Sequence, residues 1–337
     1  MADLNGITTA TGAAAIKAKI YSAQLREQLQ PALNAMNYVD VITGFPDGDS
    51  WYEAEIGNAT MRDFKEGGTI AYDSLDIGSR EFTINNYVSS GHKISEKFLQ
   101  DSYLSSQIAA KIPGLEARAI YVDLETKILA NQAGQTLNDE NVIDGVKHRF
   151  VAGGAETASG TAKYGTLVPE DFFYAGAGLT THGYTANRVA IVPAWQEYAI
   201  PTNPDFMESL SFNPKWEGIV STGAVSGMKF VFSVAGFDVY TSNYTPVVTE
   251  TIQSRMLTTD VAAVNAGVAM LFANEPGRRP WRLAWRMMPK MESEWDMDTR
   301  EEKYVTVARY GIGAGDKANL FCVLCKHRPT STFTAQS

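Results

Sequence analysis

The stretch at 57–79 restricts the fold of this chain more than any other feature of the sequence. It reads GNATMRDFKEGGTIAYDSLDIGS and is polar and interrupted by glycine. A strand-like segment, SWYEAEI, precedes it, and apolar residues alternate again in REFTINNYVSSGHKIS, which follows. The pattern predicts a long two-stranded excursion that leaves the body of the protein and returns. Since an isolated hairpin with so few apolar residues is marginal in water, we expect the excursion to lie against a partner.

The segments on either side of the excursion predict helices. Residues 1–13 are small and polar, which predicts a flexible N-terminal arm. Apolar residues at roughly helical spacing then run from Ile16 to Leu29 and predict an amphipathic helix, which Pro31 bends or ends.

A broad apolar stripe over 103–131 predicts one long helix after the excursion. Pro113 and Gly114 interrupt this stripe. Because proline lacks an N–H group and clashes with the preceding turn, the pair predicts a kink in the helix.

The second half of the chain mixes helical and strand signals. Helix start and stop residues frame 168–183, and strand patterns surround Ala235 and Gly236. There is no internal repeat and no series of strand–helix–strand units. The expected fold class is therefore α+β.

The glycine-rich stretch ARYGIGAGDKANL, at 308–320, raises the question of a phosphate-binding loop. Such a loop needs a strand before it and a helix N-terminus after it. The preceding KYVTVARY is strand-like, but the following ANLFCVLCK is an apolar run without helical period. Strand, turn and strand is the better interpretation, with Gly311, Gly313 and Gly315 in turn or bulge conformations.

Composition excludes several classes of protein. A length of 337 residues with 45% hydrophobic content allows one large or two ordinary domains. A net charge of −9 argues against tight, sequence-nonspecific binding to nucleic acid. No apolar stretch of membrane-spanning length and no signal-peptide pattern is present, so we expect cytoplasm-like conditions.

Candidate chemical sites are weak. The histidines are far apart in sequence, and Cys322 and Cys325 should lie on opposite faces of a strand, where they cannot pair. The acidic group in EWDMDTREEK lacks the glycine and the terminal bidentate glutamate of a calcium loop. No nucleophile elbow is present. We therefore predict no catalytic residue, no cofactor site and no metal site. This prediction covers the histidines and the acidic group: His92, His148, His182, His327, Glu294, Asp296, Asp298, Glu301 and Glu302.

The order of these elements resembles the major capsid proteins of tailed bacteriophages, which have the Hong Kong 97-type fold, and it is most similar to those of short-tailed phages. The excursion 57–85, TINNYVSSGHKIS and the helix 103–131 look like the E-loop, returning strand and spine helix of that family. NRVAIVPAWQEYAI and VSGMKFVFSVAGFDVYTSNYTP look like its axial domain. EWDMDTREEKYVTVARYGIGAGDKANLFCVLC resembles its C-terminal peripheral strands.

The resemblance implies a division of the chain into four regions. These are an N-terminal arm and helix at 1–49, a first peripheral part at 50–166, an axial domain at 167–284 and a second peripheral part at 285–337. The first peripheral part contains the E-loop at 57–85 and the spine helix at 103–131. Gly311, Gly313 and Gly315 would form the turn between two peripheral strands.

The resemblance also implies a set of contacts with a neighbouring subunit. The E-loop would lie across that neighbour and pair with Arg278, Arg279 or the acidic strand 294–302. Lys65 is a candidate for the cross-linking lysine of some family members, but no acceptor can be matched, so no covalent cross-link is inferred. The contact residues expected on the E-loop are Arg62, Asp63, Lys65, Glu66, Asp73, Asp76, Arg80 and Glu81.

The function implied is that of a shell protein and not an enzyme. Copies would assemble as hexamers and pentamers into the icosahedral shell of a virion, in the cytoplasm of the bacterial host and without a membrane. The implied partners are a separate scaffolding protein, a portal protein at one vertex, weakly contacted double-stranded DNA and, as a further candidate, a decoration protein. An encapsulin-like compartment subunit is the alternative. A cofactor-free or polysaccharide-acting enzyme would need paired carboxylates in a cleft, for which no stretch argues.

Overall fold

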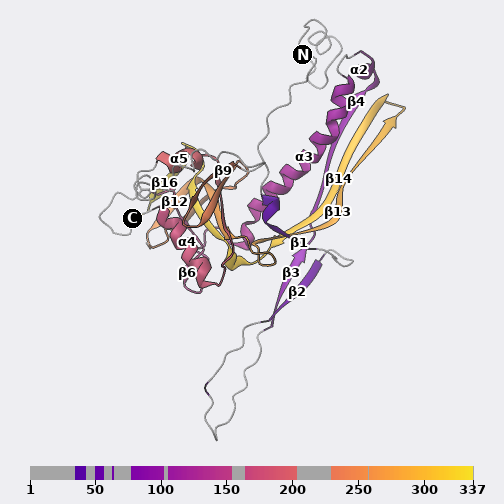
Figure 1. Cartoon of the computed structure of the whole chain (residues 1–337). Helices are drawn as coiled ribbons and strands as arrows, with labels where there is room; N and C mark the ends of the chain where they lie inside the picture. The colour runs from indigo at the N-terminus through magenta and orange to yellow at the C-terminus, as the bar shows by residue number, and fades with distance from the viewer. Residues whose placement is uncertain are drawn as a thin grey trace.

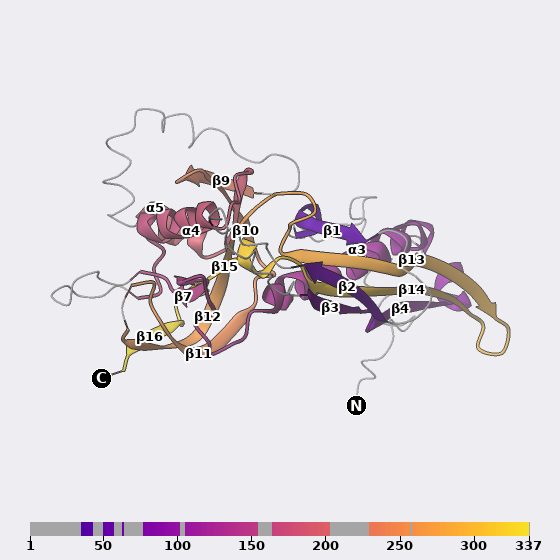
Figure 2. The same cartoon turned by 90° about the horizontal axis from the view of Figure 1, so that it is seen from below.

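The computed structural model describes residues 35–42, 50–56, 63, 77–101, 105–153, 164–202, 229–256 and 258–336. The predicted N-terminal arm and first helix lie outside these residues, as does most of the excursion. The described part has a rounded body, a long arm built on α3, and a thin ribbon that points away from both (Figures 1 and 2).

Within the described residues, an eight-stranded sheet forms the body. Its main path is β7 (Arg149–Val151), β15 (Phe321–Lys326), β12 (Asp260–Ala273), β8 (Arg188–Pro193), β10 (Phe237–Ser242) and β9 (Lys229–Val234). Two further strands, β11 (Val247–Gln253) and β16 (Thr332–Ala335), also pair with β12. The mixed sheet and its few helices agree with the predicted α+β class.

The body sheet is buried on both faces. Ala269 and Leu271 of β12 pack into the core under helix α4 (Pro169–Thr181), whereas Met270 and Phe272 pack into a second core on the other side. This two-residue alternation is the normal geometry of a strand. It also places Cys322 in the second core and Cys325 in the first, as predicted, and both thiols are free and buried.

Helix α4 begins and ends where its sequence signals predict. Pro169 stands at its first turn, and the buried carboxylate of Asp171 accepts hydrogen bonds from the N–H groups of Gly153 and Val168, at 2.9 and 3.1 Å. Gly183, with φ of +80°, follows its last turn. The short helix α5 (Gln196–Thr202) follows β8.

The arm is a four-stranded sheet with a helix along one face. The strand order is β1 (Val39–Ile42), β13 (Trp281–Asp296), β14 (Glu301–Ala314) and β4 (Asn86–Ser95). Helix α3 (Ser105–Asn131) runs beside this sheet, after the short α2 (Glu96–Asp101) (Figure 1). Its Leu124 and Ile128 pack in the second core together with Met270 of the body, so arm and body share one hydrophobic core.

The long predicted helix is confirmed, and it continues through Pro113 and Gly114 without a break in the assigned helix. A bend at this pair stays a prediction. No helix in the described ranges is long and apolar enough to span a membrane.

The remaining elements of the described residues are short. These are the 3-10 helices η1 (Ala35–Tyr38), η2 (Gln132–Gly134) and η4 (Lys317–Asn319), and two small hairpins, β2 (Ser50–Ile56) with β3 (Ile77–Thr83) and β5 (Val142–Ile143) with β6 (Val146–Lys147).

Two sequence-based expectations need correction. Gly311 and Gly313 lie inside strand β14 and not in a turn, and the chain reverses only after Ala314, at Gly315 and η4. The range 285–337 does not stay in one region either. Strand β15 pairs with β7 and β12, and β16 with β12, so the C-terminal strands belong to the body sheet.

Candidate functional site

The β2–β3 ribbon is an antiparallel pair at the base of the predicted excursion, formed by the strand that precedes the excursion and by residues 77–83 within it. Trp51 lies opposite Phe82 and Glu53 opposite Arg80. Exposed Tyr52 donates a hydrogen bond to the Glu81 carboxylate at 3.0 Å, and this bond raises the pKa of the phenol. The ribbon points away from the body and the arm (Figure 1), so it is available to another molecule.

The predicted contact residues of the excursion are only partly described. Asp63 and Glu81 are exposed, and Arg80 lies in strand β3. The remaining predicted residues lie outside the described ranges: Arg62, Lys65, Glu66, Asp73 and Asp76.

The root of the ribbon is fixed by close packing on β14. Phe82 and Ile84 are buried against Ala284. A Cβ on Gly311 would stand 2.6 Å from the backbone oxygen of Thr83, and one on Gly313 would stand 2.4 Å from the Phe82 ring. These glycines are therefore needed for the close approach of another segment, and not for turn geometry.

We expect Gly311→Ala to destabilise the protein. Because the obstructing atom is backbone and cannot rotate away, the free energy of unfolding should fall by about 1–3 kcal/mol. Gly114→Ala is the matched control, since among the described residues no atom beyond the backbone of its own helix lies within 4 Å of its added Cβ. That change should raise the free energy of unfolding by up to about 1 kcal/mol, because alanine is the better helix former. Chemical denaturation of both variants measures this, and equal effects would contradict the packing role.

The far end of the arm is the charged hairpin that joins β13 to β14. Lys303 is bonded to Asp296, whose carboxylate also accepts the backbone N–H of Asp298 at 2.9 Å. Lys93 of β4 lies 3.2 Å from Glu301. This is the predicted acidic strand, and its carboxylates range from partly to fully exposed; no metal-binding group of three or more ligands occurs in the described ranges.

Arg278 and Arg279, the other predicted contacts, already have partners within the chain. Arg279 donates to Val39 O at 3.0 Å and to Asn274 at 2.9 Å, and its guanidinium also lies 3.7 Å from Asp40. Arg278 stacks over Tyr184 and is about half exposed. Of the two, only Arg278 has a side chain that a neighbour could readily reach.

An open hollow of about 610 Å³ lies on the face of the arm sheet opposite α3. It sits at the root of the ribbon, where the chain passes from β3 to β4. Two arginines and an exposed tyrosine give it a cationic and partly apolar lining, made of Ile84, Asn85, Tyr87, Arg286, Met287 and Arg309.

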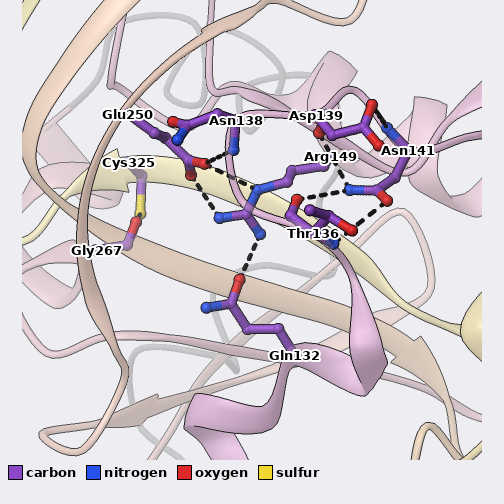
Figure 3. Close-up of polar contacts among 9 residues, drawn as sticks. All are labelled: Gln132, Thr136, Asn138, Asp139, Asn141, Arg149, Glu250, Gly267 and Cys325. Atoms are coloured by element: carbon purple, nitrogen blue, oxygen red, sulfur yellow. Dashed lines mark hydrogen bonds and ion pairs between the residues drawn. The ribbon is translucent and has the colours of Figure 1, made fainter.

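A buried ion pair that the sequence did not reveal holds the body together (Figure 3). The Arg149 guanidinium on β7 contacts the Glu250 carboxylate on β11 at 2.5 and 3.3 Å, and it also donates to Gln132. Glu250 in turn accepts the N–H of Asn138 at 2.7 Å. The only sequence sign of a buried charge here is Arg149 at the start of the run RFV, directly before two apolar residues. The charged groups of this cluster are hydrogen-bonded to one another, and the role of the cluster is structural.

A second buried pair joins two histidines. His148 Nε2 lies 3.1 Å from His182 Nε2, and His148 Nδ1 lies 3.0 Å from the carbonyl oxygen of Leu320. The carbonyl fixes a proton on Nδ1 of His148, so His182 is the donor between the rings. Burial is the main cause that lowers the pKa of His148, to about 4. The sequence separation of 34 residues had hidden this contact.

The chain is similar in fold to several solved structures. Neither a scan against models of known protein families nor a search of curated proteins finds a match. Among solved structures, the chain is similar to the capsid structure of the cyanophage P-SCSP1u, with a TM-score of 0.64, 14% identity, and coverage of 92% of this chain and 93% of that one. The mature capsid of bacteriophage PhiM1 gives a TM-score of 0.61 at 9% identity, with 92% of each chain covered. The capsid of Ralstonia phage GP4 gives 0.58 at 11% identity, covering 93% of this chain and 96% of that one.

These similarities extend over nearly the full length of both chains in each pair. The chain has the fold of phage capsid subunits.

Proposed function

We propose that this protein is the major capsid protein of a tailed bacteriophage and that copies of it form the icosahedral shell around the genome. The observation that carries the proposal is the full-length similarity of fold to several phage capsid structures. The projecting ribbon supports it, because a two-stranded hairpin standing away from its own core needs another molecule to cover it.

The described elements take their roles from the Hong Kong 97-type scheme. In this proposal the ribbon is the root of the E-loop, α3 is the spine helix and the arm sheet is the peripheral domain. The body sheet with α4 and α5 is the axial domain, which β15 and β16 complete. Shells are built from hexamers and pentamers by closed heterologous contacts, so shared surface and not catalysis is the activity.

The proposed partners follow from the same scheme. A separate scaffolding protein would direct assembly, a portal protein would occupy one vertex, and double-stranded DNA would fill the interior. The net charge of −9 suits a wall along which DNA moves without adhering. The protein would then be a component of the virion.

Electron microscopy of the expressed chain, alone and with a candidate scaffolding protein, tests the proposal. We expect closed shells, tubes or hexamers. A chain that stays monomeric in every combination would overturn it.

A charge-depleted variant tests the role of the excursion. Its charged side chains at 62, 63, 65, 66, 73 and 76 are replaced by serine. We expect this variant to keep the unfolding midpoint of the parent and to lose assembly. A control carries Glu170→Ser and Arg328→Ser, which change exposed charges on α4 and on the loop after β15. The control should assemble normally. If the charge-depleted variant assembles as well as the control, the charged side chains of the excursion are not part of the interface.

A further inference from the structure

Two histidines of the body direct the same ring nitrogen toward each other. His148 comes directly before β7, His182 comes directly after α4, and their Nε2 atoms are 3.1 Å apart. The sequence-based prediction of no metal site rested on the distances between the histidines in the sequence. The fold removes that distance for this pair, which the chain separates by 34 residues.

Each ring has an acceptor at its other nitrogen. Nδ1 of His148 lies 3.0 Å from the carbonyl oxygen of Leu320, and Nδ1 of His182 lies 3.5 Å from the carboxylate of Asp144. The ring of Phe321 stacks on that of His148, with centroids 4.1 Å apart. An acceptor at Nδ1 favours a proton there and leaves a lone pair on Nε2. This is the usual arrangement of a histidine that binds a metal through Nε2.

Two neutral rings cannot satisfy all of these contacts. If both Nδ1 atoms carry the proton, two lone pairs face each other across the 3.1 Å between the Nε2 atoms. If His182 carries its proton on Nε2 instead, the lone pair on its Nδ1 faces the carboxylate of Asp144. One additional cation at the pair, either a proton or a metal ion, removes this conflict.

The distance between the two Nε2 atoms suits a shared metal ion. Imidazole nitrogens bind Zn²⁺ at about 2.0–2.1 Å. Two such bonds to nitrogens 3.1 Å apart enclose an angle of roughly 100°, which lies between the octahedral and tetrahedral values. A metal ion can therefore enter with little movement of either ring.

The nearby charges act in opposite directions on a cation at this place. Asp144, in the turn between β5 and β6, has a side chain that is 81% exposed and places a negative charge beside His182. Lys317 in η4 lowers the pKa of His148, so its charge opposes a cation beside that ring. Imidazole nitrogens suit Zn²⁺, Cu²⁺ and Ni²⁺, whereas Ca²⁺ and Mg²⁺ prefer oxygen ligands. The donor atoms of the pair thus favour a transition-metal ion.

We propose that His148 and His182 bind one divalent transition-metal ion of the Zn²⁺ class through their Nε2 atoms. Within the described residues, no group of three His, Cys, Asp or Glu ligands exists, so water fills the remaining positions. Asp144 and the Leu320 carbonyl hold the rings in the binding orientation. The ion links the start of β7 to the end of α4 inside one subunit. The inference therefore goes beyond the proposed shell function and does not depend on it.

Zn²⁺ titration of the full, untagged chain tests the site after treatment with a chelator and with a reducing agent present. We expect calorimetry to show one ion per chain, and we expect the unfolding midpoint to rise with the concentration of Zn²⁺. His182→Gln should lose both effects. His92→Gln is the matched control, because His92 lies on the arm with a side chain that is 54% exposed, and this variant should bind as the parent does.

Two charge changes outside the ring pair give predictions of opposite sign. Asp144→Asn should weaken Zn²⁺ binding about ten- to hundredfold, which is the typical loss when a residue that orients a ligand is changed. Lys317→Gln should strengthen binding at least about twofold, because a like charge is removed. Both variants keep the two histidines, so they test the site even if His182→Gln misfolds.

The outcomes are distinct from those of the assembly experiment. A parent chain that binds no Zn²⁺ between pH 7 and pH 8 would show that a proton and not a metal ion serves the pair, and the site would be wrong. Equal binding by the parent and a folded His182→Gln variant would overturn it as well, as would Asp144→Asn and Lys317→Gln variants that both bind like the parent. None of these results changes whether the chain forms shells.

Discussion

Glu250→Gln is expected to lower the free energy of unfolding by about 3–5 kcal/mol, which is the usual cost of removing one partner from a buried ion pair. The change keeps the size of the side chain and removes its charge. Arg149 is fully buried and would then keep its guanidinium charge after losing the carboxylate that it contacts, with the Gln132 contact retained. Urea or guanidinium denaturation of the unassembled subunit measures the loss.

An exposed ion pair on the arm is the matched control for this change. Lys290 and Glu292 also lie close together, at 2.6 Å, but both side chains are about 70% exposed. Because water screens and solvates such a pair, Glu292→Gln should cause no measurable change in stability. Similar losses from Glu250→Gln and Glu292→Gln would show that burial does not govern the Arg149 cluster.

Acid is expected to destabilise the subunit through His148. Burial lowers the pKa of this histidine from about 6.5 to about 4, so the unfolded chain takes up its proton at a higher pH than the folded one. Stability is therefore full above pH 6.5 and falls as the pH drops from about 6.5 to about 4. The loss from this single group amounts to about 3 kcal/mol when complete.

The charged groups around His148 modify this effect in known directions. His182 and Lys317 lower its pKa further, whereas the Leu320 carbonyl and Asp144 raise it. His148→Asn keeps a donor for the Leu320 carbonyl and removes the titration. Free energies of unfolding measured from pH 8 to pH 4 should show a shallower slope for this variant, whatever its stability at pH 8. An unchanged slope would exclude His148 as the source of acid sensitivity.

Local elements of this fold could be predicted from the sequence because they depend on nearby residues. Periodicity predicted α3, the alternation around Ala235 and Gly236 predicted the β9–β10 hairpin, and alternation on either side of the excursion predicted the strands β2 and β3. The opposite faces of Cys322 and Cys325 followed from strand geometry alone. Agreement between local pattern and final fold is typical of such elements.

Contacts between distant segments could not be predicted in the same way. Gly311 was assigned to a turn, because its sequence does not show that Thr83 passes directly beside it. Arg149 and Glu250 are 101 residues apart, and nothing near either of them identifies the other. The hollow at the ribbon root likewise combines residues from β4, β13 and β14. In each case the decisive neighbour is set by tertiary packing.

The position of β15 inside the body sheet has a consequence for synthesis of the protein. This strand lies between β7 and β12 and carries Phe321, Val323 and Cys325 into the core under α4, yet it is translated after both of these strands. Until residues 321–326 have left the ribosome, β7 and β12 have no strand between them. The core that the arm and the body share also lacks Cys322. A nascent chain therefore cannot complete the body sheet before these residues have been synthesised.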